Sequence, residues 1–294
     1  MERGGLLIPP RLARSAVSSG WGAFLQQLPG FVAEAGDLFG VDVMAPFLPG
    51  GTTSFVAPVR TEGGGEAVLK ITWPHPEAAD EAKGLSCWAG EGAVLLQGEA
   101  RLEGGWLLLI ERCRPGRELG ERPEEEQDAV LAGLLRRLWS APTAGHFFRP
   151  LSEMCDRWAD EYERRPAPAG ARLDAGLARE GIALLRHLPR QERETVLLAT
   201  DLHAGNVLSA GREPWLMIDP KPYLGDPAYD LTQHLFNCLP RLLAAPAPTI
   251  GRLSSLAGVD PARVRLWCFA RAVEASPQWA GMAELARLLS PSVS

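Results

Sequence analysis

The most informative part of this chain, residues 196–220, reads Val196-Leu197-Leu198-Ala199-Thr200-Asp201-Leu202-His203-Ala204-Gly205-Asn206-Val207-Leu208 and then Trp215-Leu216-Met217-Ile218-Asp219-Pro220. Two apolar runs, each typical of a β-strand, lead into the carboxylates Asp201 and Asp219, and Asn206 follows shortly after the first of them. In such a layout one carboxylate can accept a proton from a hydroxyl group, while the other joins the amide oxygen in binding magnesium against nucleotide phosphates. The pattern therefore points to phosphoryl transfer.

The chain on the N-terminal side of these motifs is rich in glycine and in short apolar runs between residues 41 and 110. Glycine and proline separate the runs, so we expect the strands of an antiparallel sheet. The candidate strands are residues 55–59, 67–71, 94–97 and 106–110. Leu85 and the charged residues of the segment 76–88 recur at helical spacing, which predicts one helix against that sheet.

The sequence changes character near residues 111–116, where we expect a hinge. The segments 124–139 and 174–188 each place their leucines on one helical face, so the C-terminal part is predicted to be mainly helical. The fold class is therefore α+β, with a small β-rich lobe over residues 1–112 and a larger helical lobe over residues 113–294. The proline-rich segments 166–170 and 244–248 are predicted to be surface loops, because proline cannot continue a helix.

The composition excludes several classes of function. The net charge is -6 and the sequence contains no long basic run, so we expect no nucleic-acid partner. The five cysteines form no C-x-x-C pair, which favours reduced thiols in a cytosolic protein over a zinc site. The N-terminus lacks the pattern of a signal peptide and no run of about 20 apolar residues occurs, so we predict a cytoplasmic protein with no membrane partner.

The motifs around Asp201 resemble those of the aminoglycoside phosphotransferase family, and within it the branch of streptomycin 6-kinases and hydroxyurea phosphotransferases. The resemblance is carried by three blocks in the expected order, residues 201–208, 213–220 and 224–231. It implies a protein-kinase-like two-lobe fold and an enzyme that uses ATP and Mg²⁺. It also implies that Asp201 is the catalytic base and that Asn206 and Asp219 are magnesium ligands.

The resemblance further implies a nucleotide-binding role for Lys70, which ends the apolar run 67–70 and could reach the phosphates. Glu81 is the first choice for its carboxylate partner because it fits the helical pattern, and Glu77 is the second. Glycines that let backbone amides approach closely suggest a loop over the phosphates. This loop is predicted to include Gly50, Gly51, Thr52 and Ser54. The chain has no G-x-x-x-x-G-K-[ST] motif, which argues against a P-loop kinase.

Other polar residues near the motifs have mainly structural interpretations. His203 is expected to orient the catalytic loop by hydrogen bonding, and Asp230 to bind backbone donors. Asp226 has the position of a helix cap, but together with Glu274 it is also a candidate to face a cationic acceptor. Many relatives carry histidine at the position of Ala199, so this chain lacks one residue that supports the catalytic loop.

The acceptor is the least determined part of this interpretation. We expect a small cationic polyol, with an aminoglycoside such as streptomycin the first candidate, and an amino sugar, choline or another metabolite as the alternative. A catalytically silent nucleotide-binding module is a possibility from a different class. A metal-dependent hydrolase built around Asp201, His203 and Asp219 is a third, although the histidines show neither H-x-H nor H-E-x-x-H spacing.

Overall fold

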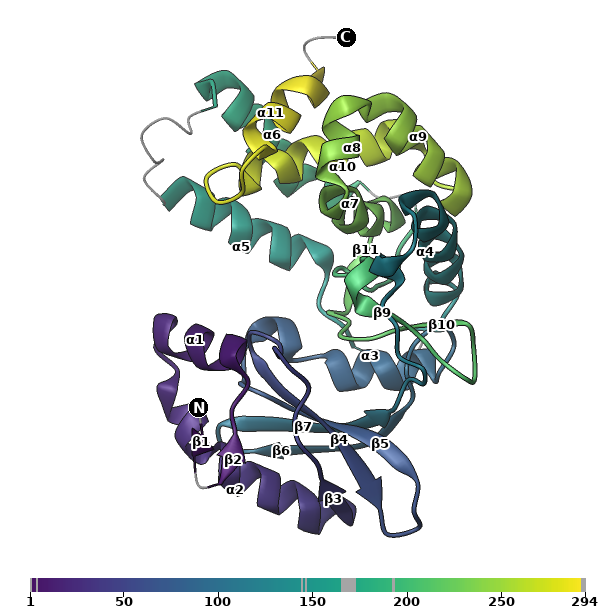
Figure 1. Ribbon diagram of the computed structural model, residues 1–294. Helices are drawn as coiled ribbons and strands as arrows, with labels where there is room; N and C mark the ends of the chain where they lie inside the picture. Colours follow the sequence, from purple (N-terminus) through teal and green to yellow (C-terminus); the bar gives the residue numbers. More distant parts are fainter. Residues whose placement is uncertain are drawn as a thin grey trace. The chain divides into compact units, whose positions relative to one another are not determined.

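The computed structural model describes residues 2–3, 5–143, 145, 147–164, 173–191 and 194–291 (Figure 1). The chain forms two compact units, the first containing residues 1–116 and 209–214 and the second residues 117–208 and 215–294. The first unit is built on a sheet and the second is mainly helical, so the predicted α+β class is confirmed. The lobe boundary at residue 112 stays a prediction, and the predicted loop at 166–170 lies outside the described residues.

An antiparallel sheet forms the framework of the first unit, with the strand order β3-β4-β5-β7-β6. Its strands are β3 (Val41–Val43), β4 (Ser54–Thr61), β5 (Glu66–Thr72), β6 (Leu96–Leu102) and β7 (Gly105–Glu111), and a separate pair contains β1 (Glu2–Arg3) and β2 (Leu6–Leu7). Three predicted strands match β4, β5 and β7. The fourth was placed too early, because β6 alternates half-buried with exposed side chains and so contains polar residues that an apolar run does not reveal.

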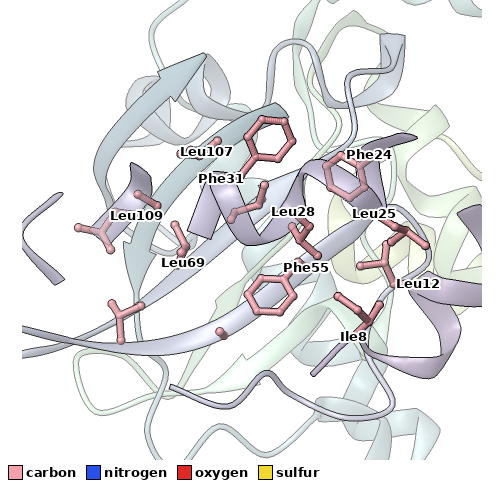
Figure 2. Close-up of a cluster of buried hydrophobic side chains, with 14 of the residues drawn as sticks. Ile8, Leu12, Phe24, Leu25, Leu28, Phe31, Phe55, Leu69, Leu107 and Leu109 are labelled. Atoms are coloured by element: carbon pink, nitrogen blue, oxygen red, sulfur yellow. The ribbon is translucent and has the colours of Figure 1, made fainter. Parts of the chain in front are cut away.

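The core of the first unit lies between one face of this sheet and two helices that were not predicted, α1 (Pro10–Ser18) and α2 (Gly22–Phe39). Figure 2 shows Phe24, Leu28 and Phe31 of α2 packed against the sheet residues Leu69 and Leu107. Side chains alternate between the two faces of a strand. Leu69 therefore points into this core, while its neighbour Lys70 belongs to the opposite face.

Helix α3 (Glu81–Trp88) supplies the ion-pair partner of Lys70 and follows the short 3₁₀ turn η1 (Pro76–Ala78). The sequence predicted one continuous helix over residues 76–88, and this is wrong in detail. The backbone leaves the helical conformation at Asp80, whose φ and ψ are -111° and 8°, so α3 begins at Glu81. That start places Glu81 in the first turn of the helix.

Helices account for most of the second unit. They are α4 (Glu124–Trp139), α5 (Leu151–Arg164), α6 (Ala175–His187), α7 (Pro227–Asn237), α8 (Leu239–Ala244), α9 (Pro246–Ala257), α10 (Pro261–Ala275) and α11 (Met282–Leu289). The predicted helices 124–139 and 174–188 correspond to α4 and α6. The loop predicted at 244–248 is wrong, because Pro246 starts α9, and proline is favoured in a first turn, where its missing N–H needs no partner. In the described part of the chain, no helix is both long and apolar enough to cross a membrane.

A buried carboxylate joins four of these helices. Asp128 of α4 is fully buried and accepts hydrogen bonds from Arg241 of α8 at 2.7 and 2.9 Å, His234 of α7 at 3.0 Å and Arg252 of α9 at 3.1 Å. Burial raises the pKa of Asp128, but its hydrogen bonds with His234 and Arg241 and the positive charge of Arg241 lower it by more. The net pKa therefore lies well below the ordinary value.

Replacing Asp128 with Ala should lower the free energy of unfolding by about 3 to 5 kcal/mol, because it leaves the buried His234 and the partly buried Arg241 without the carboxylate that they bind. The pKa of Asp128 is lower in the folded state, so its contribution is complete above about pH 4, the ordinary carboxyl value, and declines as the pH falls. Urea unfolding of both proteins at about pH 7 and about pH 3 measures this, and the difference between the two stabilities should be smaller at the lower pH.

The matched control is Asp156→Ala, which removes an ion pair with Arg190 whose side chains are 37% and 49% exposed. Solvent screens such a pair, so the control should lose far less stability. If Asp128→Ala lost no more than the control near neutral pH, the Asp128 cluster would not hold the four helices together.

Candidate functional site

Two short strand pairs in the second unit bring Asp201, Asn206 and Asp219 together. β8 (Val196–Leu198) pairs with β11 (Tyr223–Gly225), and β9 (Val207–Ser209) pairs with β10 (Trp215–Met217). The backbone N–H of Ile218 donates to the Asn206 carbonyl oxygen at 2.9 Å, which places Asp219 beside Asn206. The Asn206 side-chain nitrogen in turn donates to the Asp201 carbonyl oxygen at 3.0 Å. Hydrogen bonds thus connect the turn that carries Asp201 and Asn206 to the segment after β10 that carries Asp219.

The loop that carries Asp201 is held by a buried carboxylate from α7. Asp230 is fully buried, and its two oxygens accept the backbone N–H groups of Ala199 at 3.1 Å and Thr200 at 2.7 Å, together with the indole N–H of Trp139 at 2.9 Å. Burial raises the pKa of Asp230 to about 6, although these three hydrogen bonds oppose the shift. Asp230 has the predicted structural role, because its bonds hold the backbone at Ala199 and Thr200.

The backbone is strained beside both acidic residues of the loop. Thr200 and Asp219 each have a φ of 54°, in the left-handed region that residues with a Cβ rarely adopt. Thr200 is stabilised there because its amide is bound by Asp230 and its hydroxyl donates to the Lys221 carbonyl oxygen. Such strain is common at functional sites, where the surrounding structure enforces one conformation.

His203 supports the loop from within. Its Nδ1 accepts a hydrogen bond from the backbone N–H of Gly205 at 3.1 Å and so caps the 3₁₀ turn η4 (Ala204–Asn206). Burial lowers the pKa of His203, although the negative charge of Asp201 opposes this shift. The imidazole is therefore kept neutral and able to accept this bond, in agreement with the predicted orienting role.

Asn206 and Asp219 have the donor atoms that a hard divalent cation requires. The hydrogen bond to Asp201 uses the nitrogen of the Asn206 amide, which leaves the oxygen for a ligand. Among the described residues, no group of three or more His, Cys, Asp or Glu could hold a metal by itself. One amide oxygen and one carboxylate suit an ion that takes its other ligands from phosphate and water, as Mg²⁺ usually does.

Lys221 is a site residue that sequence reasoning missed. Its ammonium lies 2.6 Å from Oδ2 of Asp201, and its backbone N–H donates to the Ala199 carbonyl oxygen at 2.9 Å. One signal was available: only Lys70, Lys83 and Lys221 are lysines among 30 basic residues. In a chain whose cationic side chains are mostly arginine, a lysine is a candidate for a position that requires the compact ammonium group.

In the first unit, the ammonium of Lys70 lies 2.6 Å from both carboxylate oxygens of Glu81. Glu81, the first of the two candidate partners, is therefore the carboxylate that pairs with Lys70. Both side chains are nearly inaccessible, at 7% and 4% exposure, so the pair is screened little by solvent. β5 and α3 together hold this cation in a fixed position.

The glycine loop between β3 and β4 is fixed at both ends. Gly50 has a φ of 83°, and a Cβ there would lie 2.3 Å from Cβ of Pro9, so no larger residue fits. At the other end, the hydroxyl of Ser54 is buried and pairs with the Thr72 hydroxyl at 2.9 Å across β4 and β5. Gly51 and Thr52 between them are exposed. These two residues are the accessible part of the predicted phosphate loop.

The prediction that Asp226 faces a cationic substrate is wrong, because the protein's own groups surround this carboxylate. It is 5% exposed and caps α7 by accepting from the Ala228 N–H at 3.0 Å. Its Oδ2 also accepts from Arg263 and Trp267 of α10, both at 2.6 Å. The guanidinium that this carboxylate binds therefore belongs to the protein itself. Glu274 is half-buried on α10, and its predicted role stays a prediction.

Comparison with known proteins gives a consistent picture. The family model described as "Aminoglycoside/hydroxyurea antibiotic resistance kinase" matches residues 43–282. The chain is 37% identical over 280 residues to a hydroxyurea phosphotransferase from Kitasatospora aureofaciens, covering 91% of this chain and 78% of that protein. It is 34% identical over 234 residues to a streptomycin 6-kinase from Streptomyces glaucescens, covering 76% of this chain and 74% of that protein.

Solved structures share the fold at lower identity. A choline kinase from Streptococcus pneumoniae superposes with a TM-score of 0.61 at 12% identity, covering 90% of this chain and 97% of that one. An aminoglycoside phosphotransferase from Streptomyces rimosus, solved with ADP and streptomycin, has a TM-score of 0.56 at 18% identity and covers 86% of this chain and 99% of that one. These similarities show the protein-kinase-like fold that the motifs predicted.

Replacing Asp230 with Asn should loosen the loop that carries Asp201. An amide nitrogen cannot accept a hydrogen bond, so at least one of the three N–H donors loses its partner, at a cost of about 1 to 3 kcal/mol. We expect faster amide hydrogen exchange at Ala199 and Thr200, measured by mass spectrometry or NMR. Asp174→Asn, which alters the exposed cap of α6, is the control and should leave exchange at these two residues unchanged. Unchanged protection in Asp230→Asn would show that the carboxylate does not anchor the loop.

Proposed function

Because this chain belongs to the family of aminoglycoside/hydroxyurea antibiotic resistance kinases, we propose that it transfers the γ-phosphoryl group of ATP to a hydroxyl group of a small cationic polyol. The first candidate is an aminoglycoside such as streptomycin, the substrate in the name of two relatives that are each 34% identical. The observation that carries the proposal is the set of hydrogen bonds that connects the segments of Asp201, Asn206 and Asp219. A catalytic centre for phosphoryl transfer needs one proton acceptor and ligands for one divalent cation, and these residues supply both.

In this proposal Asp201 is the catalytic base. Its side chain is 18% exposed, so the substrate that receives the phosphoryl group can approach this carboxylate. Asp201 aligns the acceptor hydroxyl and takes its proton as the new O–P bond forms and the bond from the γ-phosphorus to the leaving ADP oxygen breaks. The rate gain comes mainly from positioning and from electrostatic stabilisation, because the protein forms no covalent bond with the phosphoryl group.

Further residues are assigned to the nucleotide and its metal ion. We assign Lys70 to the phosphates and Glu81 to holding Lys70 in place, with Gly51 and Thr52 covering the phosphates through their backbone. Asn206 and Asp219 hold the divalent cation, for which Mg²⁺ is our choice because so few protein ligands are offered. When bound, the cation neutralises phosphate charge.

Hydroxyurea is the second candidate acceptor. The hydroxyurea phosphotransferase from Kitasatospora aureofaciens is 37% identical over 91% of this chain, a longer match than either streptomycin 6-kinase gives. Hydroxyurea also presents a hydroxyl group, but it is small and uncharged. Streptomycin and hydroxyurea therefore differ in charge, and a binding site with charged groups can distinguish them.

A substrate panel with MgATP tests the proposed function. Streptomycin, hydroxyurea, glucosamine and choline should be compared by kcat/KM, with phosphorylated product identified by mass spectrometry. We expect streptomycin to give the highest value, and its KM to rise with added salt because attraction between opposite charges is screened. A higher kcat/KM for hydroxyurea would select the second candidate, and a higher value for choline or glucosamine would indicate a metabolic kinase. ATP binding without turnover of any acceptor would indicate a silent nucleotide-binding module.

Two substitutions separate the base from the metal ligand. Asp201→Asn keeps the shape but removes the proton acceptor, so kcat should fall by about 10² or more while ATP affinity changes little. Asp219→Ala should abolish turnover and also weaken metal-dependent ATP binding, which calorimetry with and without Mg²⁺ measures. Asp156→Asn, on the exposed face of α5, should behave as wild type. Loss of ATP binding in Asp201→Asn, in parallel with the rate, would contradict its assignment as the base.

A further inference from the structure

We infer that Lys221 is a positioning residue for Asp201 whose charge reserves this carboxylate for a neutral hydroxyl group of the acceptor. The inference rests on the proposed function, in which Asp201 is the base. The ammonium of Lys221 lies 2.6 Å from Oδ2 of Asp201. The pair is partly open, with side-chain exposures of 29% for Lys221 and 18% for Asp201. A molecule in solution can therefore reach Asp201 while Lys221 is bound to it.

The backbone fixes Lys221 relative to Asp201. The carbonyl oxygen of Ala199 accepts both the Asp201 N–H at 2.8 Å and the Lys221 N–H at 2.9 Å. The carbonyl oxygen of Lys221 in turn accepts the hydroxyl of Thr200, which lies directly before Asp201. Two hydrogen bonds to adjacent residues of the loop therefore hold the backbone from which the ammonium extends. The contact is built into the loop and does not depend on a long side chain meeting its partner by chance.

The cationic groups of a charged acceptor would compete with its hydroxyl group for Asp201, and Lys221 reduces this competition. A carboxylate binds an ammonium or guanidinium more strongly than a neutral hydroxyl, because charge-assisted hydrogen bonds are the stronger class. Without a cation of its own, Asp201 would attract the charged groups of the acceptor and hold them where the hydroxyl must lie. Lys221 neutralises the carboxylate from one side. The remaining Oδ1 is then the acceptor for the proton of a hydroxyl group.

The choice of lysine fits this role better than arginine would. Arginine is the usual cation in this chain, which has only three lysines among 30 basic residues. A guanidinium forks onto both oxygens of a carboxylate, whereas an ammonium is a compact point charge. An arginine at position 221 would supply the same charge but would compete with the hydroxyl for the second oxygen. Charge and shape therefore make separate contributions that two substitutions can distinguish.

The experiment compares Lys221→Met, Lys221→Arg and wild type. Binding of streptomycin and of the neutral probe hydroxyurea is measured by calorimetry with a non-hydrolysable ATP analogue, and kcat is measured with the best acceptor. In Lys221→Met, kcat should fall by about tenfold or more while the affinity for streptomycin rises about threefold to tenfold, because the cation binds Asp201 unproductively. The affinity for hydroxyurea should not change. Lys221→Arg should restore the wild-type affinity for streptomycin but leave kcat reduced.

Two controls make the result specific. Lys83→Met removes the pair with Asp80 at 2.8 Å, where the lysine side chain is 42% exposed, and should change neither affinity nor kcat. The double variant Asp201→Asn/Lys221→Met should lose the gain in streptomycin affinity, which would trace that gain to Asp201. Lys221→Gln replaces Lys221→Met if the methionine variant does not fold, as judged by circular dichroism.

The outcomes separate this inference from the proposed function. Suppose that the wild-type protein turns over an acceptor, but streptomycin binds Lys221→Met no more tightly than it binds the wild type. Lys221 then has no such role and the inference is wrong, whatever the change in kcat. If the wild-type protein turns over no acceptor, the proposed function fails and the inference fails with it. If Lys221→Met binds streptomycin more tightly and has a lower kcat, while its affinity for hydroxyurea is unchanged, the result supports both the proposed function and the inference.

Discussion

The structure of the candidate site depends on one buried carboxylate and the N–H groups that it accepts. Asp230 has no access to solvent, so its charge is tolerated only because Ala199, Thr200 and Trp139 donate to it. The same bonds hold Thr200 in a left-handed conformation that a β-branched residue rarely adopts. The direction in which the chain enters Asp201 is therefore set by α7.

The acids of the second unit divide into two groups by burial. Asp128, Asp226 and Asp230 are buried, and each is surrounded by donors from its own unit. Asp201 and Asp219 are more accessible, and they are the residues assigned to chemistry. A buried carboxylate must use its lone pairs on protein donors, because an unpaired buried charge is very costly. Asp201 and Asp219, which keep access to solvent, are therefore the acids available to a substrate or a metal ion.

Lys70 of the first unit and Lys221 of the second are each paired with a carboxylate, but in different surroundings. Lys70 and Glu81 are 7% and 4% exposed, so their attraction is strong and their geometry is fixed. Lys221 and Asp201 are 29% and 18% exposed, so solvent and ligands can compete for them. The first pair suits a cation that must stay in place. The second suits a carboxylate that has to exchange partners during a reaction.

The local sequence was sufficient to predict features that arise from neighbouring residues. The apolar run of β5, the helical face of α4 and the spacing of Asp201, Asn206 and Asp219 are short-range patterns, and the structure contains each of them. Other features depended on residues far apart in the chain. Asp226 is covered by Arg263 and Trp267 of α10, so its burial could not be known until that helix was placed.

Lys221 likewise could not be assigned to the site from the local sequence. It contacts Asp201 although the two residues are 20 positions apart. The contact exists because the chain returns after β9 and β10, so that the backbone N–H groups of Asp201 and Lys221 both donate to the Ala199 carbonyl oxygen. The sequence by itself therefore determined which functional groups this protein has and the order in which they occur. Only the tertiary structure decided which of these groups are buried, which are paired and which remain accessible, because burial and pairing are set by the packing of distant segments.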